Sequence, residues 1–67
     1  MISRLSGILA YKSLPAVTVD VHGVGYRVFV PLTTFYELPE PGKSITLQLH
    51  THVKEDAISL FGFYTLE

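Results

Sequence analysis

Two histidines at alternate positions are the residues whose spacing most directly suggests chemistry in this sequence of 67 residues. His50 and His52 stand in a segment of alternating apolar and polar residues, so their imidazoles would share one strand face and could reach one metal ion. A third ligand would have to come from His22 or from an acidic residue. Because solvent-facing histidines on strands are far commoner than metal sites, we expect no metal and no cofactor.

Patterns typical of nucleophilic catalysis and of phosphate binding are absent from the sequence. There is no Gly-x-Ser-x-Gly segment, and no serine has a neighbouring base that would activate it. Gly23-Val24-Gly25 lacks the later glycine of a dinucleotide fingerprint and the Lys-Ser/Thr of a phosphate loop. We therefore predict no catalytic residue and expect that the chain is not an enzyme.

The four tyrosines and four phenylalanines could in principle stack on nucleobases. Because so short a chain needs large side chains to fill its core, we expect most of these rings to be buried. Phe61 and Phe63 share one strand face and, with Arg27, support an alternative function, in which a generic barrel binds single-stranded nucleic acid.

Glu55 and Asp56 are adjacent carboxylates that follow Lys54. Two such charges repel each other by about 1 kcal/mol in water, a cost that solvent at a turn can tolerate. On chemistry alone, an ordinary solvated turn is favoured over a functional site.

Size and composition indicate one small domain whose own core is marginal. A single core of this size buries only about 60% of the surface that the unfolded chain exposes. The absence of cysteine excludes a disulfide and any thiolate metal site. Charged residues make up 16% of the chain, against about 25% in an average domain, while 48% is hydrophobic. We expect a partner, or a second copy of the chain, to cover part of the apolar surface.

The charge pattern gives no strong nucleic-acid footprint. The net charge is −1, and the basic residues are scattered: Arg4, Lys12, Arg27, Lys43 and Lys54. No apolar run is long enough for a membrane span or a signal peptide, so we expect no membrane contact and a cytoplasmic location.

Strand-type alternation dominates the chain and is clearest from Ile45 to Val53. The pattern predicts five strands, at about 2–12, 17–21, 26–30, 45–54 and 57–64. Gly7 suggests a bulge or bend in the first strand, and Gly23 and Gly25 suggest the positive backbone angles of a tight hairpin.

A short helical turn is expected between the third and fourth strands. Thr34 and Glu37 have the spacing of a capping box, and Pro39 to Gly42 has the composition of a turn. The order of elements predicts an all-β, five-stranded OB-fold Greek-key barrel, with an SH3-like barrel as the nearest competitor.

Several segments together resemble the first domain of the RuvA family, and they occur in order along nearly the whole chain. They are Met1-Ile2 with Leu5 and Gly7, Gly23-Val24-Gly25-Tyr26, Thr33 to Pro39, Lys54-Glu55-Asp56, and Leu60-Phe61-Gly62-Phe63.

The resemblance implies a bacterial, cytoplasmic protein of DNA recombination and repair that forms a homotetramer on Holliday junction DNA and recruits the hexameric ATPase RuvB. It places Glu55 and Asp56 in an acidic pin, which would repel phosphates and hold strands apart at the crossover. Lys54 is the candidate for a DNA contact.

Family members continue beyond this length into a helix-hairpin-helix domain and then a third domain that contacts RuvB. The expected division is a barrel over 1–64 and the start of a linker over 65–67. We expect this length of chain alone to bind DNA weakly and not to recruit RuvB.

Overall fold

The alternating segments form five strands in a computed structural model that describes residues 2–54 and 57–64. In chain order the elements are β1 (Arg4–Ser13), β2 (Ala16–Val21), β3 (Val24–Phe29), α1 (Leu32–Glu37), β4 (Ser44–Lys54) and β5 (Ala57–Phe63). Every predicted strand is present, and some ends differ from the prediction by one or two residues.

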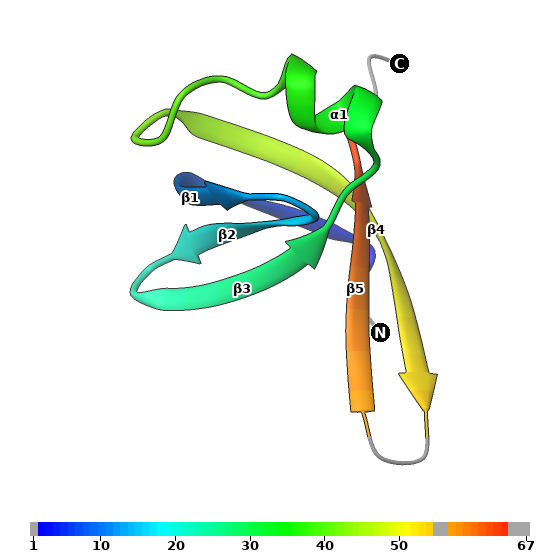
Figure 1. Ribbon diagram of the computed structural model, residues 1–67. Coiled ribbons are helices and arrows are strands. Elements are labelled where there is room, and N and C mark those ends of the chain that lie inside the picture. The colour runs from blue at the N-terminus through cyan, green and yellow to red at the C-terminus, as the bar shows by residue number, and fades with distance from the viewer. Residues whose placement is uncertain (1, 55–56, 65–67) are drawn as a thin grey trace.

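The strands close into a barrel in the order β1-β2-β3-β5-β4 (Figure 1). The β3–β5 ladder is parallel, and the other four ladders are antiparallel. Helix α1 connects β3 to β4 and lies at one end of the barrel. This topology confirms the predicted OB-fold with a short helix between the third and fourth strands.

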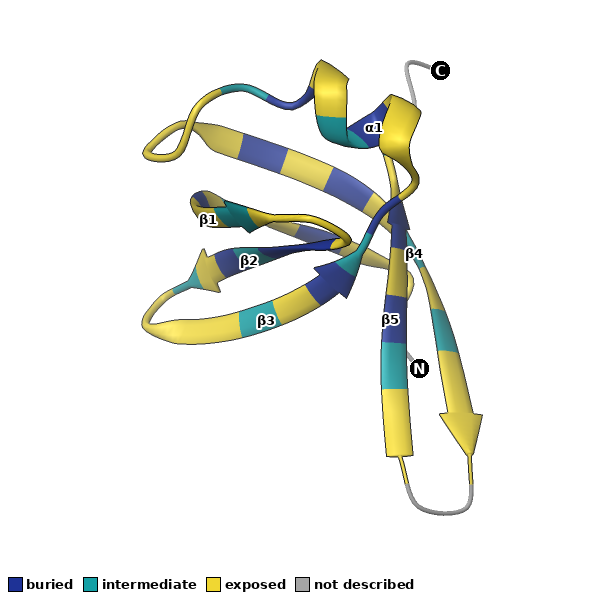
Figure 2. Cartoon of the chain, viewed as in Figure 1, coloured by how far each residue is buried: buried dark blue, intermediate teal, exposed yellow. Residues whose placement is uncertain are grey.

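The barrel interior is aliphatic. Alternate residues of every strand point inward, and the most completely buried of them are Leu9, Leu47, Val17, Val19 and Val28 (Figure 2). The expectation that most aromatic rings fill the core is wrong. All eight lie among the described residues and none is buried, although Tyr26, Phe35 and Tyr64 pack against the core from its edges.

Barrel closure depends on a close approach between β3 and β5. Their ladder consists of the pairs Val28↔Leu60 and Phe29↔Phe61. Gly62 is buried next to this ladder, and a Cβ on it would lie 2.6 Å from Val28 Cγ1. A side chain at this position would therefore separate the two strands that complete the barrel.

The first strand changes partners near its middle. It pairs with β4 from Arg4 to Ile8 and with β2 from Ile8 onward, and the register shift lies between Leu9 and Tyr11. The predicted bulge is thus farther along the strand than Gly7. Gly7 instead permits a close approach, because a Cβ there would lie 2.5 Å from the carbonyl oxygen of Asp20.

The prediction of positive backbone angles in the β2–β3 hairpin is right for Gly23 and wrong for Gly25. In the β2–β3 hairpin the positive φ angles belong to His22 (52°) and Gly23 (92°), whereas Gly25 is part of β3. Positive φ at both central residues is typical of a two-residue hairpin turn that matches strand twist. The Asp20 carboxylate accepts a hydrogen bond from Gly23 N–H at 2.8 Å, which further fixes the turn.

The predicted capping box is not formed. The N-cap of α1 is Pro31, which has no hydroxyl to accept a capping hydrogen bond, and Thr34 is buried inside the helix. Lys12 supports this end of the barrel: its Nζ lies 4.7 Å from the centre of the Phe35 ring and donates to the Leu38 carbonyl at 3.4 Å.

Replacing Gly62 by alanine should destabilise the domain by about 1–3 kcal/mol, the usual cost of forcing atoms into a packed core. Chemical denaturation followed by circular dichroism would measure this loss. Gly25→Ala is the matched control, because its Cβ would lie 3.3 Å from a Thr18 methyl that can yield, so a smaller loss is expected. Equal stabilities of Gly62→Ala and the unaltered chain would contradict this role of Gly62.

Candidate nucleic-acid interface

Beyond the barrel wall, β4 and β5 continue as a two-stranded ribbon formed by residues 52–54 and 57–59. Within this β4–β5 ribbon the two strands pair with each other, from His52↔Ser59 to Lys54↔Ala57. The β1 ladder ends at Gln48, and Ser3 and Ile2 bind β4 through Leu49 N–H (2.8 Å) and the Thr51 hydroxyl (2.7 Å). The ribbon therefore projects from the barrel (Figure 1).

The residues proposed for the acidic pin come between Lys54 and Ala57 in the sequence. Glu55 and Asp56 lie outside the described residues, so the pin stays a prediction. Lys54 is described: it is exposed, ends β4, and pairs with Ala57. It stays a candidate for a phosphate contact because its ammonium group can reach solvent beside the ribbon.

The inner face of the ribbon carries two exposed aliphatic side chains. Val53 and Ile58 are directly paired, and their side chains are 58% and 71% exposed. They continue the row of inward-facing residues that includes Leu47 and Leu60 within the barrel. Figure 2 shows both strands changing from buried to exposed toward this end. The pair is an apolar surface with no cover among the described residues.

His50 and His52 occupy the outer face of β4, as the alternation predicts, and both are exposed. His22 belongs to the β2–β3 turn instead. Among residues 2–54 and 57–64, no three histidine or acidic side chains come together in an arrangement that could hold a metal ion.

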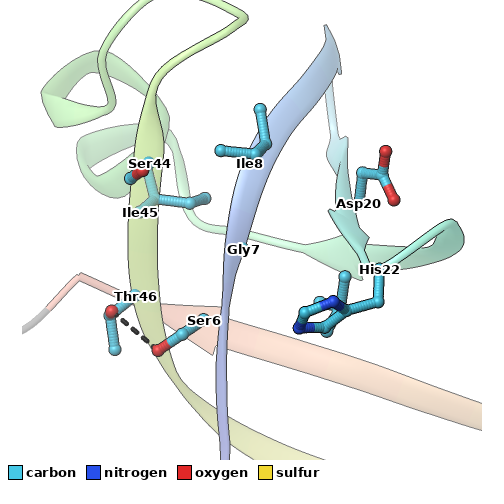
Figure 3. Close-up of a pocket in the computed structure, with 9 residues that line it drawn as sticks. Ser6, Gly7, Ile8, Asp20, His22, Ser44, Ile45 and Thr46 are labelled. Carbon is cyan, nitrogen blue, oxygen red and sulfur yellow. Dashed lines mark hydrogen bonds between the residues drawn. The ribbon is translucent and has the colours of Figure 1, made fainter.

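A surface pocket of about 410 Å³ lies where β1, β2 and β4 meet. Its polar lining includes Ser6, Asp20, His22 and Thr46 (Figure 3). The Ser6 and Thr46 hydroxyls share a hydrogen bond of 2.9 Å, and Asp20 is engaged by Gly23 N–H. The Ser6 hydroxyl is therefore bonded to another hydroxyl and not to a base that would activate it.

Three strands bring aromatic and basic side chains together on the outside of the barrel. Phe29 and Phe61 have ring centroids 5.7 Å apart, and Arg27 lies 5.5 Å from the Phe29 ring. His52 meets Phe61 edge-on at 6.3 Å. Sequence reasoning selected Arg27, Phe61 and Phe63 for nucleic-acid binding but did not join Phe29 and His52 to them, because the β3–β5 pairing that unites them is long-range. A signal was available in the period-two spacing of Arg27 and Phe29, which places them on one face.

No helix in the described part of the chain is both long and apolar enough to cross a membrane.

Comparison with known proteins then identifies the family. The family model described as RuvA N terminal domain matches residues 1–62. The chain belongs to the RuvA N-terminal domain family. The family indicated by the ordered segments of the sequence is therefore confirmed, and the structure has the predicted barrel.

Three relatives are each named Holliday junction branch migration complex subunit RuvA. Those from Geobacter metallireducens and Geobacter sulfurreducens are 62% and 64% identical over 98% of this chain and 33% of their own length. The relative from Syntrophobacter fumaroxidans is 54% identical over 98% of this chain and 34% of its own. The chain thus spans about a third of the length of the curated relatives it matches.

Proposed function

We propose that this domain is the non-catalytic assembly core of a Holliday-junction-binding subunit. The observation that carries the proposal is the 62–64% identity, across nearly the whole chain, to proteins named as subunits of the Holliday junction branch migration complex. The proposed protein is bacterial and cytoplasmic, and it serves DNA recombination and repair by holding the four-way junction open during branch migration.

Assembly as a homotetramer is the first part of the proposal. An isolated two-stranded ribbon is marginally stable in water, and this one leaves Val53 and Ile58 exposed opposite each other. Strand β5 leads away from the ribbon toward the α1 end, so any downstream chain would start about 20 Å from Ala57. A second copy is therefore better placed than the same chain to cover these side chains.

The acidic pin is the second part. In a four-fold ring, Glu55 and Asp56 from each of four chains would place eight carboxylates around the axis. Their negative charge would repel phosphates and so guide DNA strands away from the crossover. Lys54, which is exposed at the end of β4, would contact phosphate at the margin of this acidic centre.

The remaining parts of the proposal concern a longer protein. We expect the barrel to occupy 1–64 and residues 65–67 to begin a linker to a helix-hairpin-helix domain that binds phosphates. A third domain would contact the hexameric ATPase RuvB, which would supply the ATP-driven movement. The net charge of −1 fits this division, because the main cationic DNA contacts would then lie outside the barrel.

A longer protein that includes the helical domain should bind a four-way junction tightly and in preference to duplex DNA. Changing Glu55→Gln together with Asp56→Asn should strengthen duplex binding by roughly five-fold, about 1 kcal/mol, and reduce the preference for the junction. Competition gel shifts with junction and duplex probes would measure both quantities.

The control for the pin is Glu37→Gln with Glu40→Gln, which removes the same charge from exposed residues of α1 and the loop after it. Its preference for the junction should not change. If the pin variant also keeps its full preference, Glu55 and Asp56 are an ordinary solvated turn. A well-folded longer protein that fails to select the junction would overturn the proposed function.

Replacing Val53 and Ile58 by threonine in the longer protein should weaken tetramer formation at least about ten-fold, because a hydroxyl replaces apolar surface at the proposed contact. Sedimentation equilibrium would measure the assembly constant. Val24→Thr changes a valine on β3 that is 53% exposed and serves as the control. A tetramer of unchanged stability in the double variant would exclude the inner face of the ribbon as the subunit contact.

A further inference from the structure

We propose that the outside of β3, β4 and β5 forms a second DNA-binding surface, which takes unpaired bases of a single strand. This outer aromatic face consists of Arg27, Phe29, His50, His52, Phe61 and Phe63. The binding would be by stacking on the rings, with the basic side chains attracting the phosphates. This activity differs from excluding strands at a junction centre.

The side chains of this face contact one another across the three strands. Arg27 lies over Phe29 at 5.5 Å, Phe29 and Phe61 are 5.7 Å apart, and His52 meets Phe61 at 6.3 Å. His50 pairs in register with Phe61 from the other strand. Phe29 and Phe61 are thus held by their neighbours and lose little conformational freedom when a ligand binds.

Phe61 and Phe63 retain exposed surface that the fold does not use. They are 38% and 47% exposed, while Leu60, before Phe61, and Gly62, between the two rings, occupy the barrel side of β5. Side chains two positions apart on a strand are separated by about 6.6 Å. Duplex bases stack about 3.4 Å apart, so the two rings suit unstacked successive bases of a single strand.

The charge of the face complements a polyanion. The described residues of β3, β4 and β5 include Arg27 and Lys54 but no acidic side chain. Arg4 borders the face, because it pairs with Gln48 and Gln48 pairs with Phe63. The acidic residues with described positions, Asp20, Glu37 and Glu40, belong to β2, to α1 and to the loop after it.

Three acidic residues, Asp20, Glu55 and Asp56, come near the face in sequence or in register. Asp20 pairs with Gly25 at its edge, and its carboxylate is bound to the N–H of Gly23. Glu55 and Asp56 precede β5, and Ala57 and Phe61 are about 13 Å apart along that strand. At 0.1 M salt, charges are screened over about 10 Å, so a charge at the Ala57 end of β5 would act only weakly at Phe61.

The same charges favour DNA over a second copy of the chain as the occupant. Two copies packed through this face would bring Arg27 and the neighbouring basic residues of both copies together, whereas phosphates would neutralise them. The choice of DNA over other single-stranded nucleic acids rests on the proposed function. The experiment that tests this face contains neither a junction nor another domain, so its outcome is independent of the proposed function.

The test is a titration of the ¹⁵N-labelled 67-residue chain with a thymidine 12-mer, followed by NMR at 0.1 M salt. We expect shift changes at the outer aromatic face and a Kd of about 10⁻⁴ M, at the weak end of nonspecific binding. A 12-base-pair duplex should bind at least about ten-fold more weakly. Shift changes elsewhere, equal binding of the duplex, or no binding would overturn the proposal.

Phe61→Thr should weaken binding of the 12-mer about ten-fold, as expected for the loss of one stacking ring. Tyr36→Thr is the control, because it removes a ring that is 72% exposed on α1. Arg27→Gln should reduce the salt dependence of binding, while Lys43→Gln, away from the face, should not.

The spectra of each variant without DNA report whether it folds. If Phe61→Thr does not fold, Arg27→Gln, which removes no ring, still tests the proposal. Unchanged affinity in a folded Phe61→Thr variant, or an unchanged salt dependence in Arg27→Gln, would contradict the proposal. So would shifts at the face that depend on protein concentration without DNA, because they would assign the face to a second copy.

Discussion

The contact between Gly62 and Val28 is the constraint on which the rest of the structure depends. Four ladders are built from antiparallel neighbours, but the barrel is completed by the parallel pairs of β3 and β5. Without this contact, β3 would present an open edge and Val28 and Leu60 would lose their cover. It also determines where β5 leaves the wall, and it brings Phe29 beside Phe61.

The period-two geometry of strands lets the same segment serve two purposes. On the inner side of the β4–β5 ribbon are Val53 and Ile58, and on the outer side is His52. A partner that covers the aliphatic pair would leave the outer side in solvent. Assembly and nucleic-acid binding can therefore use opposite sides of one ribbon without competing for the same side chains.

Much of the fold could be predicted from the sequence, because alternation reports strands directly. The assignment of rings to the core failed for a physical reason: β5 is apolar on both faces, and alternation does not say which face is inside. On β5 the close approach to β3 leaves room for Gly62 and Leu60 on the barrel side, so Phe61 and Phe63 lie outside. The capping box failed because the N-cap of α1 is Pro31, three residues before Thr34.

The candidate site was less accessible to sequence reasoning. Arg27 and Phe61 are 34 positions apart and become neighbours through Phe29, a contact that depends on how the barrel closes. The histidines were placed correctly on one strand face, since that inference needs only local geometry. The assignment of Glu55 and Asp56 to an acidic pin still rests on the family resemblance. The structure describes the strand ends on either side of them, Lys54 of β4 and Ala57 of β5.

β4 runs without interruption from the barrel wall to the end of the ribbon. Its 11 residues include neither glycine nor proline and span about 33 Å, so the strand has no obvious hinge. It pairs with β1 from Ser44 to Gln48 and with β5 from Gln48 to Lys54. A force applied along the strand at its far end would load the β1 hydrogen bonds together, in shear. The ribbon is therefore mechanically continuous with the barrel, and a force on its end would be distributed over the barrel wall.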